Sequence, residues 1–167
     1  MSVRLTTARL ALVEYEDADL PRLTQLLADP VTMAHWPAPL DAAASRAWFD
    51  RARAPYGEPG LGRFAMWCGR DYIGDAGILR AEVNGRVEND LGYIVDHAHW
   101  GHGYGLEAAR ALVEEGHRRG LRRIVANMAA SNVPSARVAE KLGMRLEARF
   151  RNPRNRNMET LLYVSER

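Results

Sequence analysis

A run of alternating glycines, Trp100-Gly101-His102-Gly103-Tyr104-Gly105, follows an apolar segment and precedes a stretch with helical periodicity. Glycine accepts backbone conformations that other residues avoid, so the run predicts a tight turn from a strand into a helix. The N–H groups in the first turn of a helix lack partners within the helix, and the helix dipole places partial positive charge at the same point. The run therefore predicts a backbone cradle for an anion, with phosphate or pyrophosphate as the expected ligand.

Two common phosphate-binding motifs do not match this run. A Walker loop ends in Gly-Lys-Ser/Thr, whereas the single lysine of the chain, Lys141, lies far from the glycines. A dinucleotide fingerprint has a third glycine three residues after the second, where this chain has Leu106. The glycine run on its own therefore leaves two interpretations open: a phosphate cradle of another class, or a turn that binds nothing.

Hydrophobic periodicity predicts an alternation of strands and helices along the chain. The expected strands cover residues 9–15, 64–68, 72–80, 87–95, 121–129, 144–150 and 159–164. Expected helices lie between Asp19 and Asp29, after a cap at Asp41, between the glycine run and Gly120, and between a cap at Asn132 and Gly143. Asn84-Gly85 predicts a tight hairpin, and the polar stretch 151–157 predicts a mobile connection. This order predicts one mixed α/β domain over residues 1–167.

Bulk composition excludes several classes of function. The chain has 167 residues, 47% of them hydrophobic, as expected for one globular domain. No apolar stretch reaches the length of a membrane span, and the N-terminus lacks the core of a signal peptide, so no membrane partner is expected. Cys68 has no second cysteine to pair with, which favours a cytoplasmic location. A net charge of +2 gives no support for a nucleic-acid partner.

Three separated motifs resemble the GNAT acetyltransferase superfamily. The glycine run followed by Glu107 is similar to the family's coenzyme A pyrophosphate loop, Q/R-x-x-G-x-G/A, with Trp100 at the Gln/Arg position. Residues 132–135 and 140–144, NVPS and EKLGM, are similar to N-x-x-S…E-K-L-G-F. The start TARLAL, residues 7–12, is similar to the E-R-L-x-L of the subgroup that includes ribosomal-protein N-terminal acetyltransferases. The likeness covers nearly the whole chain. It implies an α/β (α+β) fold with a mostly antiparallel central sheet, helices on both faces and a splayed strand pair that holds coenzyme A.

The resemblance also implies which residues bind acetyl-CoA, the expected cosubstrate. Pantetheine would pair with the main chain of one strand as an added strand, and the loop amides would bind the pyrophosphate. The implied cofactor-binding residues are Ile94, Val95, Trp100, Gly101, His102, Gly103, Tyr104, Gly105, Asn132 and Ser135. Asn132 is equally explained as a helix cap and can serve both purposes. Candidates for the adenosine 3′-phosphate are Arg110, Arg122, Arg123 and Arg137, each of which is otherwise a solvated surface arginine.

Acetyl transfer to an amine needs a base for the amine proton and a donor for the departing thiolate. Asp90 is the expected base, because related sequences often carry Glu there in an E-I-G-Y context; Glu88 lies on the same face of the strand and is the second candidate. The alternative for both is a solvent-facing carboxylate. Many family members supply a tyrosine seven residues after the Asn, where this chain has Ala139, so Ser135 is the remaining catalytic hydroxyl. Because serine is a poor acid, it would hydrogen-bond the thiolate or relay through water.

Two further groups of residues have competing explanations. His97, His99 and His102 have a spacing that invites a metal, but no cysteine or carboxylate cluster of recognised spacing accompanies them, so no metal is expected. The family resemblance implies that the acceptor pocket is bordered by Trp36, Trp48, Tyr56 and Arg63, although Trp48 is equally explained as a core residue.

The sequence therefore predicts an acetyl-CoA-dependent N-acetyltransferase that acts by direct attack of a primary amine in a ternary complex. A protein N-terminus is the first expected acceptor. Two alternatives stay open: a small-molecule amine acetyltransferase, and a non-catalytic acyl-CoA sensor, which Ala139 makes credible. A monomer or a homodimer is expected.

Overall fold

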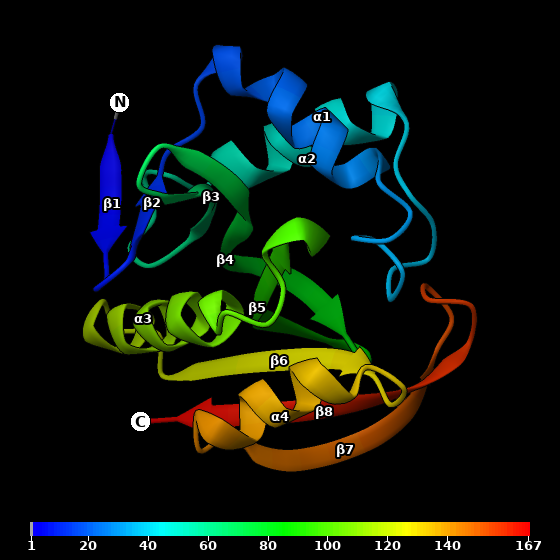
Figure 1. The fold of residues 1–167 in the computed structure, drawn as a ribbon. Helices are drawn as coiled ribbons and strands as arrows, with labels where there is room; N and C mark the ends of the chain where they lie inside the picture. The colour runs from blue at the N-terminus through cyan, green and yellow to red at the C-terminus, as the bar shows by residue number, and fades with distance from the viewer. Residues whose placement is uncertain (1) are drawn as a thin grey trace.

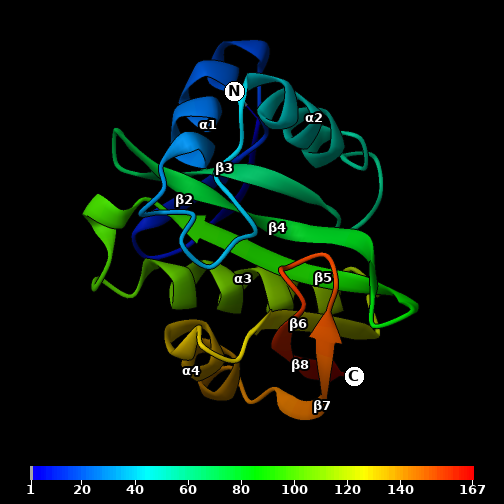
Figure 2. The same ribbon diagram turned by 90° about the vertical axis from the view of Figure 1, so that its right-hand side faces the viewer.

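An eight-stranded sheet with helices on both faces forms the framework of the computed structural model, which describes residues 2–167 (Figures 1 and 2). The strands are β1 (Val3–Thr6), β2 (Leu10–Val13), β3 (Gly62–Cys68), β4 (Asp71–Val83), β5 (Arg86–Val95), β6 (Arg123–Ala129), β7 (Arg145–Asn152) and β8 (Met158–Glu166). The helices are α1 (Leu20–Ala28), α2 (Ala42–Arg53), α3 (Tyr104–Arg118) and α4 (Val133–Lys141), with 3-10 turns at Asp17–Asp19 and His97–His99. The strand order is β1-β2-β3-β4-β5-β6-β8-β7. Only β5 and β6 pair in parallel, so the predicted fold class is confirmed.

Local sequence signals account for several element boundaries. Asp41 caps α2 by accepting the Ala44 N–H at 2.8 Å, and Asn132 caps α4 in the same way. Asn84 and Gly85 have positive φ values of 49° and 77° and join β4 to β5 in the predicted two-residue hairpin. These turns and caps form where residues with the required side chain or backbone freedom occur.

Other boundaries differ from the prediction. β1 was not expected, because it has only four residues, which lie exposed or half-buried at the edge of the sheet. The first predicted strand, 9–15, is shorter and covers only Leu10–Val13. The predicted connection 151–157 is shorter in the structure: β7 runs to Asn152, β8 starts at Met158, and the turn between them contacts a distant loop.

Two apolar layers hold the helices to the sheet. On one face, Leu23 and Leu27 of α1 and Phe49 of α2 pack against Ala65 and Ile94. On the other face, α3 and α4 pack against a larger cluster. Its strand residues include Leu12, Ile78 and Ile124, and its helix residues include Ala109 and Ala139. Figure 2 shows α1 and α2 on one side of the central strands and α3 and α4 on the other. Helices therefore cover both faces of the central sheet.

The parallel pair β5–β6 opens partway along its length. Its register joins Asp90 to Val125, and within residues 2–167 no further ladder pair connects residues 91–95 to β6. β5 continues to pair with β4 up to Val95, so only its β6 side is free. This is the splayed strand pair that the sequence predicted. It leaves main-chain groups of β5 available to a ligand beside the glycine run.

Candidate functional site

The glycine run forms the turn into α3. Gly101 and Gly103 have φ values of 81° and 79°, and Gly103 is the N-terminal cap of the helix. The first bond from the helix back to this turn is donated by the Glu107 N–H to the Gly103 carbonyl at 3.1 Å. The N–H groups of the preceding three residues point out of the helix start without helical partners. The turn therefore has the backbone geometry that the predicted anion cradle requires.

Arg9, which lies near the N-terminus, donates hydrogen bonds to this turn and to the helix that follows it. Its Nη1 donates to the His102 carbonyl at 2.9 Å, and its Nε donates to Glu107 at 2.7 Å. Its guanidinium also lies 4.7 Å from the centroid of the Tyr104 ring. The sequence analysis placed Arg9 in a family motif but gave it no role, because Arg9 and Glu107 are 98 residues apart and no local pattern connects them.

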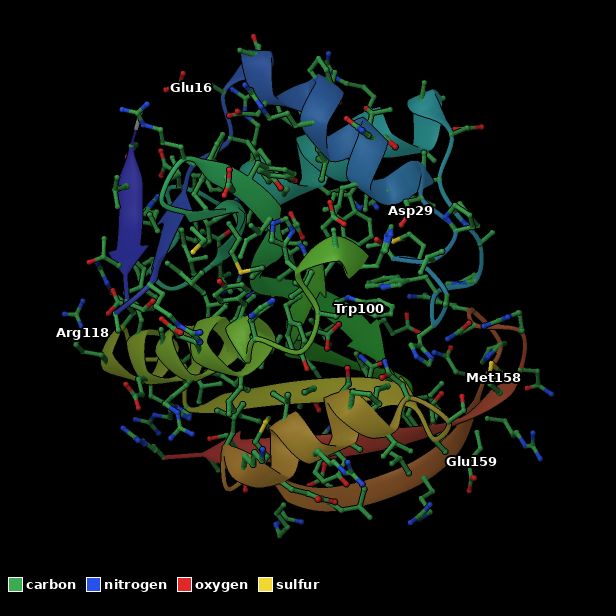
Figure 3. The ribbon with its side chains drawn as sticks, viewed as in Figure 1. Glu16, Asp29, Trp100, Arg118, Met158 and Glu159 are labelled. Atoms are coloured by element: carbon green, nitrogen blue, oxygen red, sulfur yellow. The ribbon has the colours of Figure 1, made fainter. Side chains whose placement is uncertain are left out.

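A cavity of about 510 Å³, here called the loop cavity, lies between the end of β5, the glycine run and α4. The predicted cofactor-binding residues that line it are Ile94, Val95, Trp100, Gly101, Gly103, Tyr104, Gly105, Asn132 and Ser135. His102 does not line it, since its ring stacks on Tyr104 at the surface. Trp100 lies on the connection between β5 and α3 (Figure 3), and its indole N–H donates to the Val95 carbonyl at 2.8 Å.

Basic side chains reach the loop cavity from α4. Arg137, one of the four candidates for a phosphate, lines the cavity together with Lys141, which was not predicted. Arg123 is instead bound by three carboxylates, those of Glu88, Glu147 and Glu166. Arg110 and Arg122 do not line the cavity. Arg137 and Lys141 are four residues apart on α4, so both side chains lie on the same face of the helix. Together they supply positive charge to the loop cavity.

A second cavity of about 260 Å³, here called the sheet cavity, lies over β5, β6 and the start of α4. Asp90, Arg63, Asn127 and Ala139 are among its lining residues. The two cavities adjoin, because they share lining residues: His35, Trp36, Tyr93, Asn132, Ser135 and Val138. A group carried at the end of a ligand in the loop cavity can therefore reach a second ligand in the sheet cavity.

Asp90 projects into the sheet cavity at the point where β5 and β6 separate. Its carboxylate accepts a hydrogen bond from Asn127 Nδ2 at 2.9 Å. Burial raises the pKa of Asp90 to about 7, against the lowering effects of the Asn127 hydrogen bond and the charge of Arg63. Such a carboxyl group exchanges a proton near neutral pH, which is the property of an efficient general base.

Glu88, the second predicted base, lies outside both cavities. It is 6% exposed, and Arg123 Nε donates to its carboxylate at 2.9 Å. The same guanidinium binds Glu147 at 2.5 Å and Glu166 at 2.9 Å. The prediction that Glu88 shares the strand face of Asp90 holds, but the structure does not bring its carboxylate to the site.

Ser135 lies at the junction of the cavities and shares it with a tyrosine that the sequence analysis did not single out. The Ser135 N–H donates to the Asn132 side chain at 3.3 Å, so the cap leaves the serine hydroxyl free. The Tyr93 hydroxyl donates to Ser135 Oγ at 3.4 Å. Ala139 presents only a methyl group to the sheet cavity, so no hydroxyl comes from that position.

Of the four residues predicted to border an acceptor pocket, Trp36 and Arg63 line the sheet cavity. Trp48 packs behind them, with its ring 5.2 Å from that of Trp36 and 4.9 Å from the Arg63 guanidinium. Tyr56 stacks on Phe64 and donates to the Arg63 carbonyl, away from the cavity. Arg63 is buried against Asp75, which also accepts a hydrogen bond from the Tyr15 hydroxyl at 2.8 Å.

The outer wall of the sheet cavity consists of two loops. The turn between β7 and β8 reaches the connection between α1 and α2 (Figures 1 and 2), where Asn155 Nδ2 donates to the His35 carbonyl at 3.2 Å. Arg154 and Asn155 come from the turn, Asn152 from the end of β7, and Trp36 from the facing loop. These two loops therefore bound the sheet cavity on the side where the splayed strands leave it open.

The three histidines point to separate partners. His97 Nδ1 lies 2.8 Å from Asp29, the residue that ends α1 (Figure 3), while His99 lines the loop cavity and His102 lies at the surface. Within residues 2–167, no three or more His, Cys, Asp or Glu side chains are grouped so that they can hold a metal ion. Over the same residues, no helix is both long and apolar enough to cross a membrane.

Comparisons with known proteins agree with this geometry. The model of the acetyltransferase (GNAT) domain matches residues 9–145. An L-methionine sulfoximine/L-methionine sulfone acetyltransferase from Pseudomonas paraeruginosa is 33% identical over 140 residues, 80% of this chain and 78% of its own. The crystal structure of an acetyltransferase from Agrobacterium tumefaciens is 28% identical, with a TM-score of 0.82 over 100% of this chain and 96% of its own.

A more distant structure extends the likeness of fold. The ribosomal L7/L12 alpha-N-protein acetyltransferase RimL, in complex with coenzyme A, has a TM-score of 0.81 at 18% identity, over 99% of this chain and 98% of its own. The family model covers both the glycine run and all of α4, two elements that border the loop cavity. The chain belongs to the GNAT family of acetyl-CoA-dependent acetyltransferases.

Proposed function

We propose that this protein transfers an acetyl group from acetyl-CoA to a primary amine of a small molecule held in the sheet cavity, with Asp90 as the general base. One observation carries the proposal. A carboxyl group with a pKa near 7 lies in a cavity that adjoins the loop cavity at Tyr93 and Ser135. The amine and the acetyl group would meet at that junction.

The residues of the loop cavity fit the acetyl donor. The free β6 side of β5, from Leu91 to Val95, offers main-chain groups that a pantetheine amide can bind as an added strand. The start of α3 offers unpaired N–H groups to the pyrophosphate. Arg137 and Lys141 supply positive charge for the remaining phosphate. We assign Trp100 to holding the loop, because its indole N–H already binds the Val95 carbonyl.

The chemical step starts with the amine proton. An alkylamine with a pKa of about 10.4 loses its proton at pH 7 at a cost of about 4.6 kcal/mol. Asp90 would accept this proton on its carboxylate, and Asn127 would hold the carboxylate in place. The neutral nitrogen would then attack the thioester carbonyl directly. The C–S bond would break, coenzyme A would leave as the thiolate, and the second proton of the attacking nitrogen would pass to the thiolate or to solvent, so no acetylated enzyme is formed.

Three observations favour a small acceptor over a protein N-terminus, the first acceptor that the sequence predicted. The sheet cavity has a volume of about 260 Å³, slightly below the usual range for sites of drug-sized ligands. The Asn155–His35 contact bounds it on the outer side. The relative at 33% identity is named for acetylation of two amino-acid derivatives. A protein N-terminus is the second candidate, because the TARLAL start is similar to that subgroup.

The test is thiol release from acetyl-CoA over a panel of amino acids, small amines and peptides. We expect turnover with a small amine and none above background with peptides of five or more residues. Peptides that outperform every small amine would overturn the acceptor class and leave the transferase intact. Gly103→Asp tests the donor site separately: its carboxylate would occupy the pyrophosphate position, so calorimetry should show a severe loss of acetyl-CoA affinity. Unchanged affinity in a folded variant would contradict the loop assignment.

A further inference from the structure

The hydroxyl groups of Tyr93 and Ser135 form a pair on the wall that the two cavities share. Tyr93 lines both cavities, and its hydroxyl donates to Ser135 Oγ at 3.4 Å. On the proposed path, an acetyl group passes from a donor in the loop cavity to an amine in the sheet cavity along this shared wall. The sulfur of the donor would then lie beside these two hydroxyls.

The direction of this hydrogen bond decides what Ser135 can do. A hydroxyl has one hydrogen to donate and two lone pairs that accept. Because Tyr93 donates its hydrogen to Ser135, the serine hydrogen is left to donate elsewhere. The serine backbone N–H is already used by the Asn132 cap, so the cap does not compete for the hydroxyl. Burial raises the pKa of Tyr93, which keeps its proton and remains a donor throughout the neutral range.

Gly105 holds the tyrosine ring in this position. A Cβ atom at residue 105 would lie 2.9 Å from Tyr93 Cε2, closer than side chains approach one another. The third glycine of the run therefore gives space to the ring as well as flexibility to the loop. Tyr93 is consequently seated by α3, the helix whose start forms the anion cradle, and the hydroxyl pair and the cradle are fixed relative to each other.

We propose that Tyr93 is a positioning residue that directs the Ser135 hydroxyl hydrogen to the sulfur of coenzyme A, replacing the hydroxyl that is missing at Ala139. The serine alone is too weak an acid to protonate a thiolate. As a donor polarised by a second hydroxyl, it stabilises negative charge on sulfur through a charge-assisted hydrogen bond. The inference rests on the proposed path between the cavities, but it does not depend on which amine is acetylated.

The test measures the pKa of the coenzyme A thiol bound to the protein, with no acceptor present, from the ultraviolet absorbance of the thiolate as pH is raised. A hydrogen bond to the sulfur lowers this pKa below the ordinary thiol value of about 8.5. We expect Ser135→Ala and Tyr93→Phe each to raise it by about one unit. Because the tyrosine acts through the serine, Tyr93→Phe made in Ser135→Ala should add no further change.

Tyr163→Phe is the matched control. It also removes a hydroxyl from a sheet tyrosine, but that hydroxyl donates to Glu140 at 3.2 Å and lies outside both cavities. The control should leave the bound thiol pKa and the turnover unchanged, whereas Tyr93→Phe should lower turnover by about 10-fold with little change in coenzyme A affinity. A bound thiol in the unaltered protein with the pKa of the free thiol, or additive effects of the two substitutions, would overturn the proposal. Thiol titration without acceptor turnover would instead point to a wrong acceptor class.

Discussion

Glu88 and Asp90 lie two residues apart on the same face of β5, yet their carboxylates have opposite surroundings. Glu88 lies beside Arg123 of β6, whose guanidinium binds its carboxylate at 2.9 Å. Asp90 pairs with Val125 of β6, and its carboxylate accepts a hydrogen bond from a neutral amide, that of Asn127. The bound cation keeps Glu88 out of the cavities, whereas burial without a directly bound cation raises the pKa of Asp90 to about 7.

The strongest test of this contrast is Asp90→Asn. General-base catalysis contributes about 10²–10⁴-fold, so we expect turnover at pH 7 to fall by at least about 100-fold. The unaltered enzyme should show kcat/KM rising with pH through about 7, the pKa of Asp90, and the variant should lose this step. Steady-state kinetics from pH 5.5 to about 9 would show both effects. An unchanged pH profile in the variant would remove Asp90 from the mechanism.

The matched substitution, Glu88→Gln, should have the opposite pattern. Removing one partner of a buried ion pair is strongly destabilising, but Arg123 keeps Glu147 and Glu166, so we expect a loss of about 2–3 kcal/mol in the free energy of unfolding. Turnover should stay within about twofold of the unaltered enzyme. Urea unfolding and the same kinetic assay measure the two quantities. A large loss of turnover without a loss of stability would show that the two carboxylates are not separated as the structure indicates.

Asp90→Asn should also stabilise the protein above neutral pH. The folded pKa of Asp90, about 7, lies above the unfolded value of about 3.9, so its protonated form favours folding. This contribution is complete below about pH 4 and is lost as pH rises to about 7. At pH 8 the variant should therefore be more stable by about 2 kcal/mol, half of the full linkage value because Asp90 borders a cavity. Equal stability of both proteins at pH 8 and pH 5 would contradict the buried, unpaired carboxylate.

The smallest effect is expected at Glu147, a partly exposed carboxylate that Arg123 binds. The Arg123 hydrogen bond lowers the pKa of Glu147 to about 2, below the unfolded value of about 4.3. Its stabilisation is present above about pH 4.3 and is lost as pH falls toward 2. Glu147→Gln should flatten the loss of stability over that interval, and salt should shrink the difference because the pair is partly exposed. Melting curves of both proteins between pH 2 and 5 with the same slope would show that this pair contributes nothing.

The sequence predicted the parts of the fold that local chemistry decides. Asn84-Gly85 can form the tight hairpin turn wherever it occurs between two strands, and Asp41 and Asn132 cap the helices that follow them. β1 escaped prediction because its four residues, exposed or half-buried at the edge of the sheet, give too short a pattern. The connection 151–157 was expected to be mobile because its polar residues show no sign of the contact that Asn155 makes with His35.

The site was predictable to a smaller extent, since it depends on contacts between distant segments. The glycine run predicted the turn that lines the loop cavity, and the family match and strand parity predicted Asp90, which lines the sheet cavity. Strand parity also made Glu88 the second candidate, because parity holds no information about Arg123, 35 residues away. Arg9 is 98 residues from Glu107, and the place of the Tyr93 ring depends on the missing side chain of Gly105. Such pairings become visible only when the sheet is assembled.

The wall of the sheet cavity has a consequence for how this enzyme family can diversify. The proposed base, Asp90, lies on β5 and the proposed anion cradle at the start of α3, whereas the outer wall belongs to the loops around His35 and Asn155, which a hydrogen bond from a side chain to the backbone joins. Insertions, deletions or exchanges in these loops alter the shape that an incoming molecule must match, at little cost to the framework. Acceptor preference can therefore change in evolution, or be transferred by grafting the two loops, while the residues of β5 and α3 stay the same.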